Sequence, residues 1–132
     1  MTAQERMEIL AAAVHQAWYC VSVLSHHERG NTWTSAPDWQ KSVIYHTVAF
    51  WESMDFTPAS HFEVGRVTHA VWMKYMSRQG WVYGPTLDLD TKTDPDMVSF
   101  DNLPESEREK DYAVIDTYLV MRVVLGEPSR NS

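Results

Sequence analysis

Gly80-Trp81-Val82-Tyr83-Gly84-Pro85 is the stretch that decides the fold class of this chain. Two aromatic residues alternate with a valine between two glycines, which is typical of a short strand that packs against a helix. The preceding residues, 57–79, have helical periodicity, with Thr57-Pro58 as the cap and first turn and Gly80 as the C-terminal stop. The stretch therefore indicates the end of a helix and the start of a short strand.

The segment 81–102 differs in composition from the rest of the chain. It holds two Pro, one Gly and five Asp, residue types that favour turns. Two short runs within it, Trp81–Tyr83 and Met97–Phe100, have the composition of strands, and we expect them to pair as a small hairpin.

Three further helices are expected. Thr2 and Glu5 have capping-box spacing in front of a helical apolar stripe, and Ser35-Ala36-Pro37-Asp38 reads as a second helix start. The last helix begins at Leu103-Pro104-Glu105 and ends at Gly126. Its expected core stripe is Tyr112, Ile115, Leu119 and Val123. The sequence thus predicts a mainly α fold of four compact helices, with a short β-hairpin between the third and the fourth.

The length and composition fit one domain with a modest core. Of 132 residues, 44% are hydrophobic, which argues against wholesale disorder. Six Trp and six Tyr are many for this length, and such side chains both fill a small core and stack on flat ligands. Eleven basic against 18 acidic residues give a net charge of −7, which argues against broad nucleic-acid binding.

The sequence also bears on the compartment. Cys20 is the single cysteine, so no intrachain disulfide can form, and the polar start of the chain does not have the apolar run of a signal peptide. No apolar run approaches the roughly 18 residues that a membrane-spanning helix needs. We therefore expect a soluble cytoplasmic protein that neither binds membranes nor carries a cofactor.

Catalytic and metal-binding signatures are missing from the sequence. It contains no G-x-S-x-G, Walker A or G-x-G-x-x-G motif. Asp88-x-Asp90-x-Lys92 starts like a calcium loop but lacks the glycine and the final glutamate of one. His26-His27 have no Cys pair or H-E-x-x-H around them, and Cys20 lies near an apolar helical stripe. We expect no catalytic and no metal-ligating residues.

The pattern H-x-x-W occurs twice, as His15 and Trp18 in the first expected helix and as His69 and Trp72 in the third. Residues three apart on a helix are neighbours on its surface. Each pair reads either as a core Trp beside a hydrogen-bonded His, or as a Trp platform that stacks a purine while the His donates a hydrogen bond to it. Whether the repeat marks a structural duplication with pseudo-two-fold symmetry stays open, because the flanking residues match poorly.

Residues 69–126 resemble the ryanodine-receptor repeat domain, or RyR domain. The matching motifs follow in the order and spacing of that family: His69-Ala70-Val71-Trp72, Gln79 to Pro85, Lys92-Thr93-Asp94-Pro95, Val98-Ser99-Phe100 and Leu103-Pro104-Glu105. The upstream part is similar to small stand-alone bacterial and viral members, through Trp39-Gln40 and through Thr57-Pro58 leading to His61. The resemblance divides the chain into a helical N-terminal half (1–56), the RyR repeat proper (57–126) and a polar tail (127–132).

The resemblance also implies a fold and a ligand. In the giant calcium channels these repeats occur in tandem pairs that form two-fold-related, mostly helical horseshoes with short strands. In one channel pair, the cleft between the halves looks like an adenine-nucleotide site lined by the H-x-x-W residues of both halves. Carried over, this nominates His69 and Trp72 as ligand-binding residues and, through the second occurrence of the pattern, His15 and Trp18.

The basic residues of that channel site do not carry over. Leu87 stands where the channel site has a basic residue, and Asp94 and Asp96 replace a usual His and Cys. Any phosphate contact would have to come from other basic residues: Arg66, Lys74, Arg78 or Lys92. Trp81 and Tyr83 complete the candidate site, although the glycines beside them favour a packing role.

Three functional hypotheses follow. The first is a non-catalytic domain that binds an adenine-type nucleotide (ATP or AMP, ADP-ribose, cyclic ADP-ribose or a cyclic dinucleotide), either as a sensor or as a sequestering protein that blunts nucleotide immune signalling. The second is a protein-interaction or structural module without a ligand. The third is a nucleotide hydrolase that uses His69 or His15 with a carboxylate. A homodimer is a further alternative, because two copies could complete a cleft that one chain forms only in half.

Overall fold

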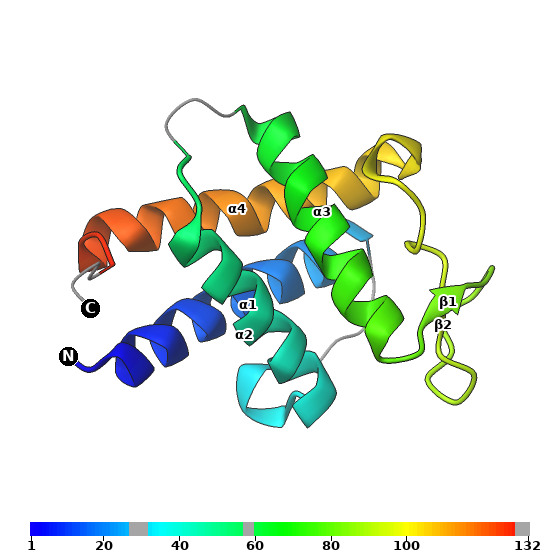
Figure 1. Cartoon of the computed structure of the whole chain (residues 1–132), viewed down its shortest axis with the longest axis horizontal. Coiled ribbons are helices and arrows are strands. Elements are labelled where there is room, and N and C mark those ends of the chain that lie inside the picture. Colours follow the sequence, from blue (N-terminus) through cyan, green and yellow to red (C-terminus); the bar gives the residue numbers. More distant parts are fainter. Residues whose placement is uncertain (27–31, 57–59, 129–132) are drawn as a thin grey trace.

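The computed structural model describes residues 1–26, 32–56 and 60–128. These form a mainly helical fold, as the sequence predicted (Figure 1). The helices are α1 (Ala3–His26), α2 (Asp38–Ser53), α3 (His61–Arg78) and α4 (Glu105–Leu125). Two short strands, β1 (Val82–Tyr83) and β2 (Thr93–Asp94), lie between α3 and α4. Two single 3₁₀ turns, Trp33–Ser35 and Phe100–Asn102, precede α2 and α4.

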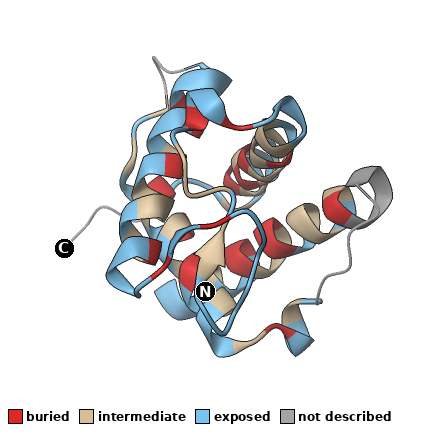
Figure 2. Ribbon diagram, turned by 90° about the vertical axis from the view of Figure 1, so that its right-hand side faces the viewer, coloured by how far each residue is buried: buried red, intermediate tan, exposed pale blue. Residues whose placement is uncertain are grey.

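Each of the four helices packs against at least two others. Helix α1 runs along α4 and also contacts α2, while α3 packs against α2 and α4 (Figure 1). The buried residues lie in patches along the helices rather than all round them (Figure 2). The main core cluster comes from all four helices: Leu10, Ala11, Val14, Val48, Trp51, Val64, Ile115 and Tyr118. Burying this apolar surface is the main stabilising term of the fold.

Local signals set the helix starts. Thr2 and Glu5 form the predicted capping box, since the Glu5 amide donates to Thr2 Oγ1 and the Thr2 amide to Glu5 Oε1, both at 3.0 Å. Helix α3 is capped by Ser60, whose hydroxyl accepts from the Glu63 amide at 3.2 Å. The expected start at Thr57-Pro58 lies outside the described residues.

Gly80 ends α3, as the sequence predicted. Its φ is +93°, a conformation that glycine adopts without a Cβ penalty. The Gly80 amide donates to the Ser77 carbonyl at 3.0 Å and the Trp81 amide to the Met76 carbonyl at 3.1 Å, which is the Schellman pattern. Trp81 and Met76 also pack together in a second core cluster. Gly80 and Trp81 therefore fix the direction in which the chain leaves α3.

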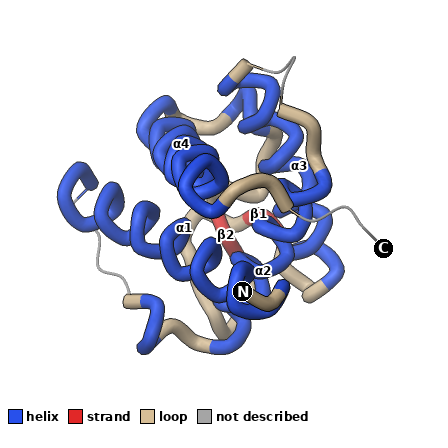
Figure 3. The backbone as a smooth tube through the Cα atoms, turned by 90° about the vertical axis from the view of Figure 1, so that its left-hand side faces the viewer, coloured by secondary structure: helices blue, strands red, loops and turns tan. Residues whose placement is uncertain are grey.

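The two-stranded element lies where it was expected, but its pairing differs. Strand β1 pairs with β2, in parallel, with Val82 opposite Thr93 and Tyr83 opposite Asp94 (Figure 3). Gly84 permits this close approach, because a Cβ on it would lie 2.5 Å from the Cβ of Thr93. The expected hairpin partner, 97–100, instead leads into a 3₁₀ turn whose Phe100 ring packs on Gly65 of α3.

The core face of α4 also differs from the predicted stripe. Ile115 is buried as expected, but Val123 is 84% exposed. The buried face instead carries Tyr118 and Arg122. Tyr118 packs its ring on Trp51 of α2, and Leu119 and Leu125 are partly buried against the main core cluster.

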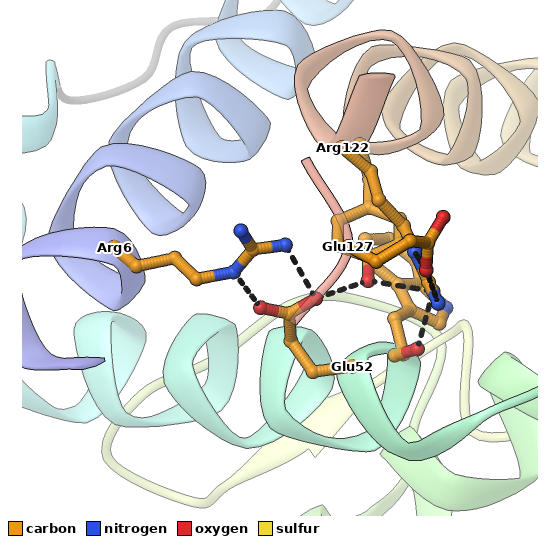
Figure 4. A network of polar contacts seen from close by, with 6 residues as sticks. Arg6, Glu52, Arg122 and Glu127 are labelled. Carbon is orange, nitrogen blue, oxygen red and sulfur yellow. Dashed lines mark hydrogen bonds and ion pairs between the residues drawn. The ribbon is translucent and has the colours of Figure 1, made fainter. Parts of the chain in front are cut away.

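Arg122 belongs to a polar network that ties α1, α2 and α4 together (Figure 4). Glu52 accepts from Arg6 Nε at 2.5 Å and from the Tyr118 hydroxyl at 2.6 Å. Arg122 in turn donates to the Tyr118 hydroxyl at 3.2 Å and to Glu127 at 2.8 Å. Burial acts to raise the pKa of Glu52, but these hydrogen bonds outweigh it and hold the pKa below its usual value.

Among the described residues, no helix is long and apolar enough to span a bilayer.

Candidate functional site

A cavity of about 230 Å³ lies among the four helices and the segment before α4. All four helices contribute side chains to its wall, and the segment that carries β1 and β2 adds Leu87, Asp94, Asp96 and Leu103. The wall is mostly apolar and includes four tryptophans: Trp18, Trp39, Trp51 and Trp72. An apolar cavity with a few convergent polar groups is the usual form of a small-molecule site.

Both H-x-x-W pairs line this cavity. His15 and Trp18 reach it from α1, and His69 and Trp72 reach it from α3. The sequence left open whether the two pairs share a cleft, because they come from helices far apart in the chain. Tertiary packing brings them to the same wall.

His69 is held in place by the segment before α4. Its Nε2 donates to the Val98 carbonyl at 2.7 Å, and its ring stacks on Trp72 with centroids 5.2 Å apart and an interplanar angle of 24°. Burial lowers the pKa of His69, against the opposing effect of nearby backbone carbonyls and Asp94. The ring is therefore fixed in its neutral form at neutral pH, and it supports the face of Trp72.

His15 is fully buried, with 0% of its surface exposed. Its Nε2 lies 2.9 Å from Gln40 Oε1, so Nε2 is the protonated nitrogen and donates this hydrogen bond. The other nitrogen, Nδ1, is then an acceptor, and it has no hydrogen-bond partner among the described residues. A buried acceptor without a donor costs roughly 1–3 kcal/mol, and a donor on a bound ligand would remove that cost.

Four carboxyl groups line one part of the cavity wall: Asp94, Asp96, Glu107 and Asp111. We call these four residues the carboxyl cluster. The one lysine or arginine in the wall, among the described residues, is buried Lys110, whose Nζ donates to Glu107 Oε1 at 3.0 Å. The cavity therefore has an excess of negative charge when all five groups are ionised.

Burial and mutual repulsion raise the pKa values of three of these residues, Asp94, Asp96 and Asp111. Burial, then the charges of Glu107 and Asp94 and a hydrogen bond with Glu107, raise the pKa of Asp96 to about 7. Burial and the charge of Glu107 also raise the pKa of Asp111 to about 7, although Lys110 opposes this. The pKa of Asp94 is raised by the same causes, burial first. Asp96 and Asp111 thus titrate close to neutral pH.

Sequence reasoning did not propose the carboxyl cluster as part of the site. Leu103-Pro104-Glu105 served to mark the start of the last helix, and Asp94 and Asp96 were interpreted as departures from the family pattern. The sequence does contain a signal for this cluster. One face of the last helix, at the spacing i, i+3, i+4, i+7, carries Glu107, Lys110, Asp111 and Val114.

The basic residues proposed for phosphate contacts lie outside the cavity wall. Arg66 is paired with exposed Asp101, at 2.5 Å from NH2 to Oδ2. Lys92 donates from Nζ to the Gln79 carbonyl at 2.7 Å. Lys74 and Arg78 are exposed on α3 and do not line the cavity. Their role as ligand contacts stays a prediction that this geometry does not favour.

The strand aromatics take different positions. Trp81 is buried against Trp39, with ring centroids 5.6 Å apart, and does not itself line the cavity. Tyr83 is exposed on β1 and does not line the cavity. The buried Trp81 agrees with the packing role that the glycines favour, whereas the exposed Tyr83 does not.

Comparison with protein families matches the RyR domain to residues 61–127. The chain belongs to the RyR domain family. The matched part of this RyR domain begins with α3 and includes both strands and α4, so it holds His69, Trp72 and the whole carboxyl cluster. The second pair, His15 and Trp18, comes from α1, which precedes the matched residues. The cavity of this RyR domain is thus built jointly by the matched part and the N-terminal helices.

Proposed function

We propose that this RyR domain is a non-catalytic binding domain for an adenine-type nucleotide, such as ATP or AMP, ADP-ribose, cyclic ADP-ribose or a cyclic dinucleotide. One observation carries the proposal: the pairs His15/Trp18 and His69/Trp72 line a single cavity. A flat base between such aromatic side chains gains roughly 1–3 kcal/mol per stacking contact.

The size of the cavity indicates which part of the ligand enters. Sites that enclose a whole drug-sized ligand have volumes of roughly 300–1,000 Å³. At about 230 Å³ this cavity is smaller, which suits a base with part of its sugar. The phosphates then lie at the mouth or in solvent, away from the buried Lys110.

Two biological uses fit such a domain. A sensor would bind the nucleotide and change its contacts with a partner protein. A sequestering protein, of the kind that a virus could use to blunt nucleotide immune signalling, would act by binding alone and would need a dissociation constant below the ligand concentration. Both uses agree with a cytoplasmic location.

The test is isothermal titration calorimetry against a panel of these nucleotides and adenosine. Trp72→Ala removes one face of the proposed base site and should weaken binding about tenfold or more. Tyr83→Ala is the matched control, because it removes an exposed aromatic that does not line the cavity. Absence of binding by every compound, or equal affinities for wild type and Trp72→Ala, would refute the proposal.

The non-catalytic part of the proposal has its own measurement. Chromatography of the bound ligand after long incubation should recover it unchanged, whereas turnover would indicate a hydrolase.

A protein-interaction module is the second candidate, and one observation favours it. Val120, Val123 and Val124 are exposed together near the end of α4. Exposed valines at this spacing form an apolar strip of the kind found at protein interfaces. Sedimentation equilibrium of the wild type and of Val123→Lys tests the homodimer form of this candidate, since a dimer through the strip should dissociate in the variant.

A further inference from the structure

The charges in the cavity wall restrict which end of a ligand can enter it. The carboxyl cluster (Asp94, Asp96, Glu107 and Asp111) supplies four acidic groups, against the single ammonium of Lys110. None of these four side chains has an arginine partner in the described part of the chain, and the Lys110 ammonium already donates to Glu107. A phosphate placed here would meet like charges in a partly buried environment, where repulsion is poorly screened.

We infer that the ligand presents an amine, or another nitrogen group that donates hydrogen bonds, to the carboxyl cluster and keeps its phosphates outside the cavity. The inference rests on the proposed function and assigns the orientation and chemical class of the bound group. For an adenine-type ligand, the exocyclic amino group of the base is the donor, and the inner wall selects an amino-substituted ring.

His15 provides a second, independent reason for a donor-rich ligand. It is fully buried, lines the same cavity, and carries an unpartnered acceptor at Nδ1. Because its Nε2 hydrogen is already given to Gln40, the ring can satisfy Nδ1 only by accepting a hydrogen bond. Both the carboxyl cluster and the Nδ1 atom of His15 thus favour a ligand that donates hydrogen bonds.

The aromatic wall strengthens the preference. Trp18, Trp39 and Trp72 line the cavity together with the carboxyl cluster. The faces of tryptophan rings attract cations, by about 0.5–2 kcal/mol each, and neutral N–H groups more weakly. A carboxylate-bearing cavity with indole walls therefore favours a flat ring whose nitrogen substituents carry partial or full positive charge.

The titration of the carboxyl cluster predicts a pH dependence of binding. The groups that face these carboxyls are His69 from α3 and Lys110 and Glu107 from α4, while α1 contributes His15 and α2 only uncharged side chains. Asp96 and Asp111 have pKa values of about 7 in the free protein, so each is largely protonated at pH 6 and largely ionised at pH 8. A donor group binds the ionised form better, so binding should release protons and strengthen as pH rises.

The experiment is titration calorimetry of the full chain with adenosine, inosine and ATP between about pH 6 and about pH 8. Inosine is the matched probe, because it replaces the amino group of adenosine with a carbonyl. We expect adenosine to bind at least tenfold more tightly than inosine, and ATP no more tightly than adenosine. The affinity for adenosine should rise over this range by up to roughly tenfold for each titrating carboxyl that the ligand contacts.

Asp96→Asn and Asp111→Asn test the residues themselves. Each should flatten the pH dependence of adenosine binding and reduce the preference over inosine. Both variants keep the shape of the side chain, and Glu107→Gln is the alternative if either fails to fold, as judged by circular dichroism. An exposed acid away from the cavity, Asp90→Asn, should leave both quantities unchanged.

The outcomes separate this inference from the proposed function. If ATP binds tenfold more tightly than adenosine, if inosine equals adenosine, or if affinity falls as pH rises, the orientation is wrong while nucleotide binding stands. If none of the three compounds binds, the proposed function fails and the inference fails with it.

Discussion

His69 donates from Nε2 to the backbone carbonyl of Val98 at 2.7 Å, and this hydrogen bond attaches the segment before α4 to the inner face of α3. Val98 lies two residues after Asp96 and four after Asp94 in the chain, so the same contact helps to set where these two carboxyls lie relative to Trp72. One histidine thus supports the aromatic wall by stacking and the acidic wall by a hydrogen bond.

His69→Ala should therefore lower the free energy of unfolding. The change leaves the Val98 carbonyl without its donor and removes the ring that supports Trp72, and an unsatisfied buried carbonyl alone costs roughly 1–3 kcal/mol. Urea denaturation measures the loss. His46→Ala is the control, since His46 is exposed on α2, and a loss there as large as that in His69→Ala would contradict the assignment.

Gly80→Ala should destabilise the fold by about 1–2 kcal/mol, because the residue has a φ of +93° that a side chain disfavours. Thermal or urea unfolding measures the change. Ala70→Gly serves as the reverse control: it lies at an exposed position within α3, where glycine costs about 1 kcal/mol through helix propensity alone. A Gly80→Ala variant as stable as wild type would show that this turn does not need a left-handed conformation.

The ion pair between Arg6 and Glu52 and the ion pair between Arg66 and Asp101 should differ strongly in how much they stabilise the fold. Glu52→Ala breaks a pair with Arg6 whose side chains are only 16% and 13% exposed, and it leaves Arg6 and Tyr118 without their acceptor. We expect a loss of about 3 kcal/mol. Asp101→Ala breaks the pair with Arg66, where the side chains are 49% and 58% exposed, and should cost less than about 1 kcal/mol. Urea denaturation of both variants side by side gives the comparison.

The carboxyl cluster should make the protein less stable as pH rises from about 4 to about 7. The pKa values of Asp96 and Asp111 are raised to about 7 in the folded protein and lie near 4 in the unfolded chain. Between these values the folded state binds more protons, so its stability falls with pH and the loss is complete above about pH 7. The double variant Asp96→Asn, Asp111→Asn should lack this part of the pH profile in urea denaturation. An unchanged profile would contradict the raised pKa values.

Much of the fold could be predicted from local signals. The capping box of Thr2 and Glu5, the stop at Gly80 and the four helices depend on hydrogen bonds and backbone preferences between residues close in sequence. The pairing of β1 was predicted less well, because its partner was chosen by composition. The structure uses Thr93–Asp94 instead, where Gly84 leaves room for Thr93.

The candidate site likewise has residues that the sequence predicted and residues that it did not. The H-x-x-W pattern of His15/Trp18 and His69/Trp72 is visible in the sequence, as is the resemblance that gives it meaning. The basic residues proposed for phosphate contacts lie outside the cavity, since they are exposed on α3 or in the turn before β2. Val123 of α4 was misplaced because the buried face of the helix follows Ile115, Tyr118 and Arg122 rather than the predicted stripe.

The sequence by itself determined the four helices, the capping box of Thr2 and Glu5, the stop at Gly80 and the family, because these depend on residue types at short fixed spacings. Tertiary structure alone decided that α1 and α3 bring their histidines and tryptophans to one cavity, and that Asp94, Asp96, Glu107 and Asp111 close it with acid rather than base. The physical reason is that packing joins residues far apart in the chain, and burial then changes what their charges do.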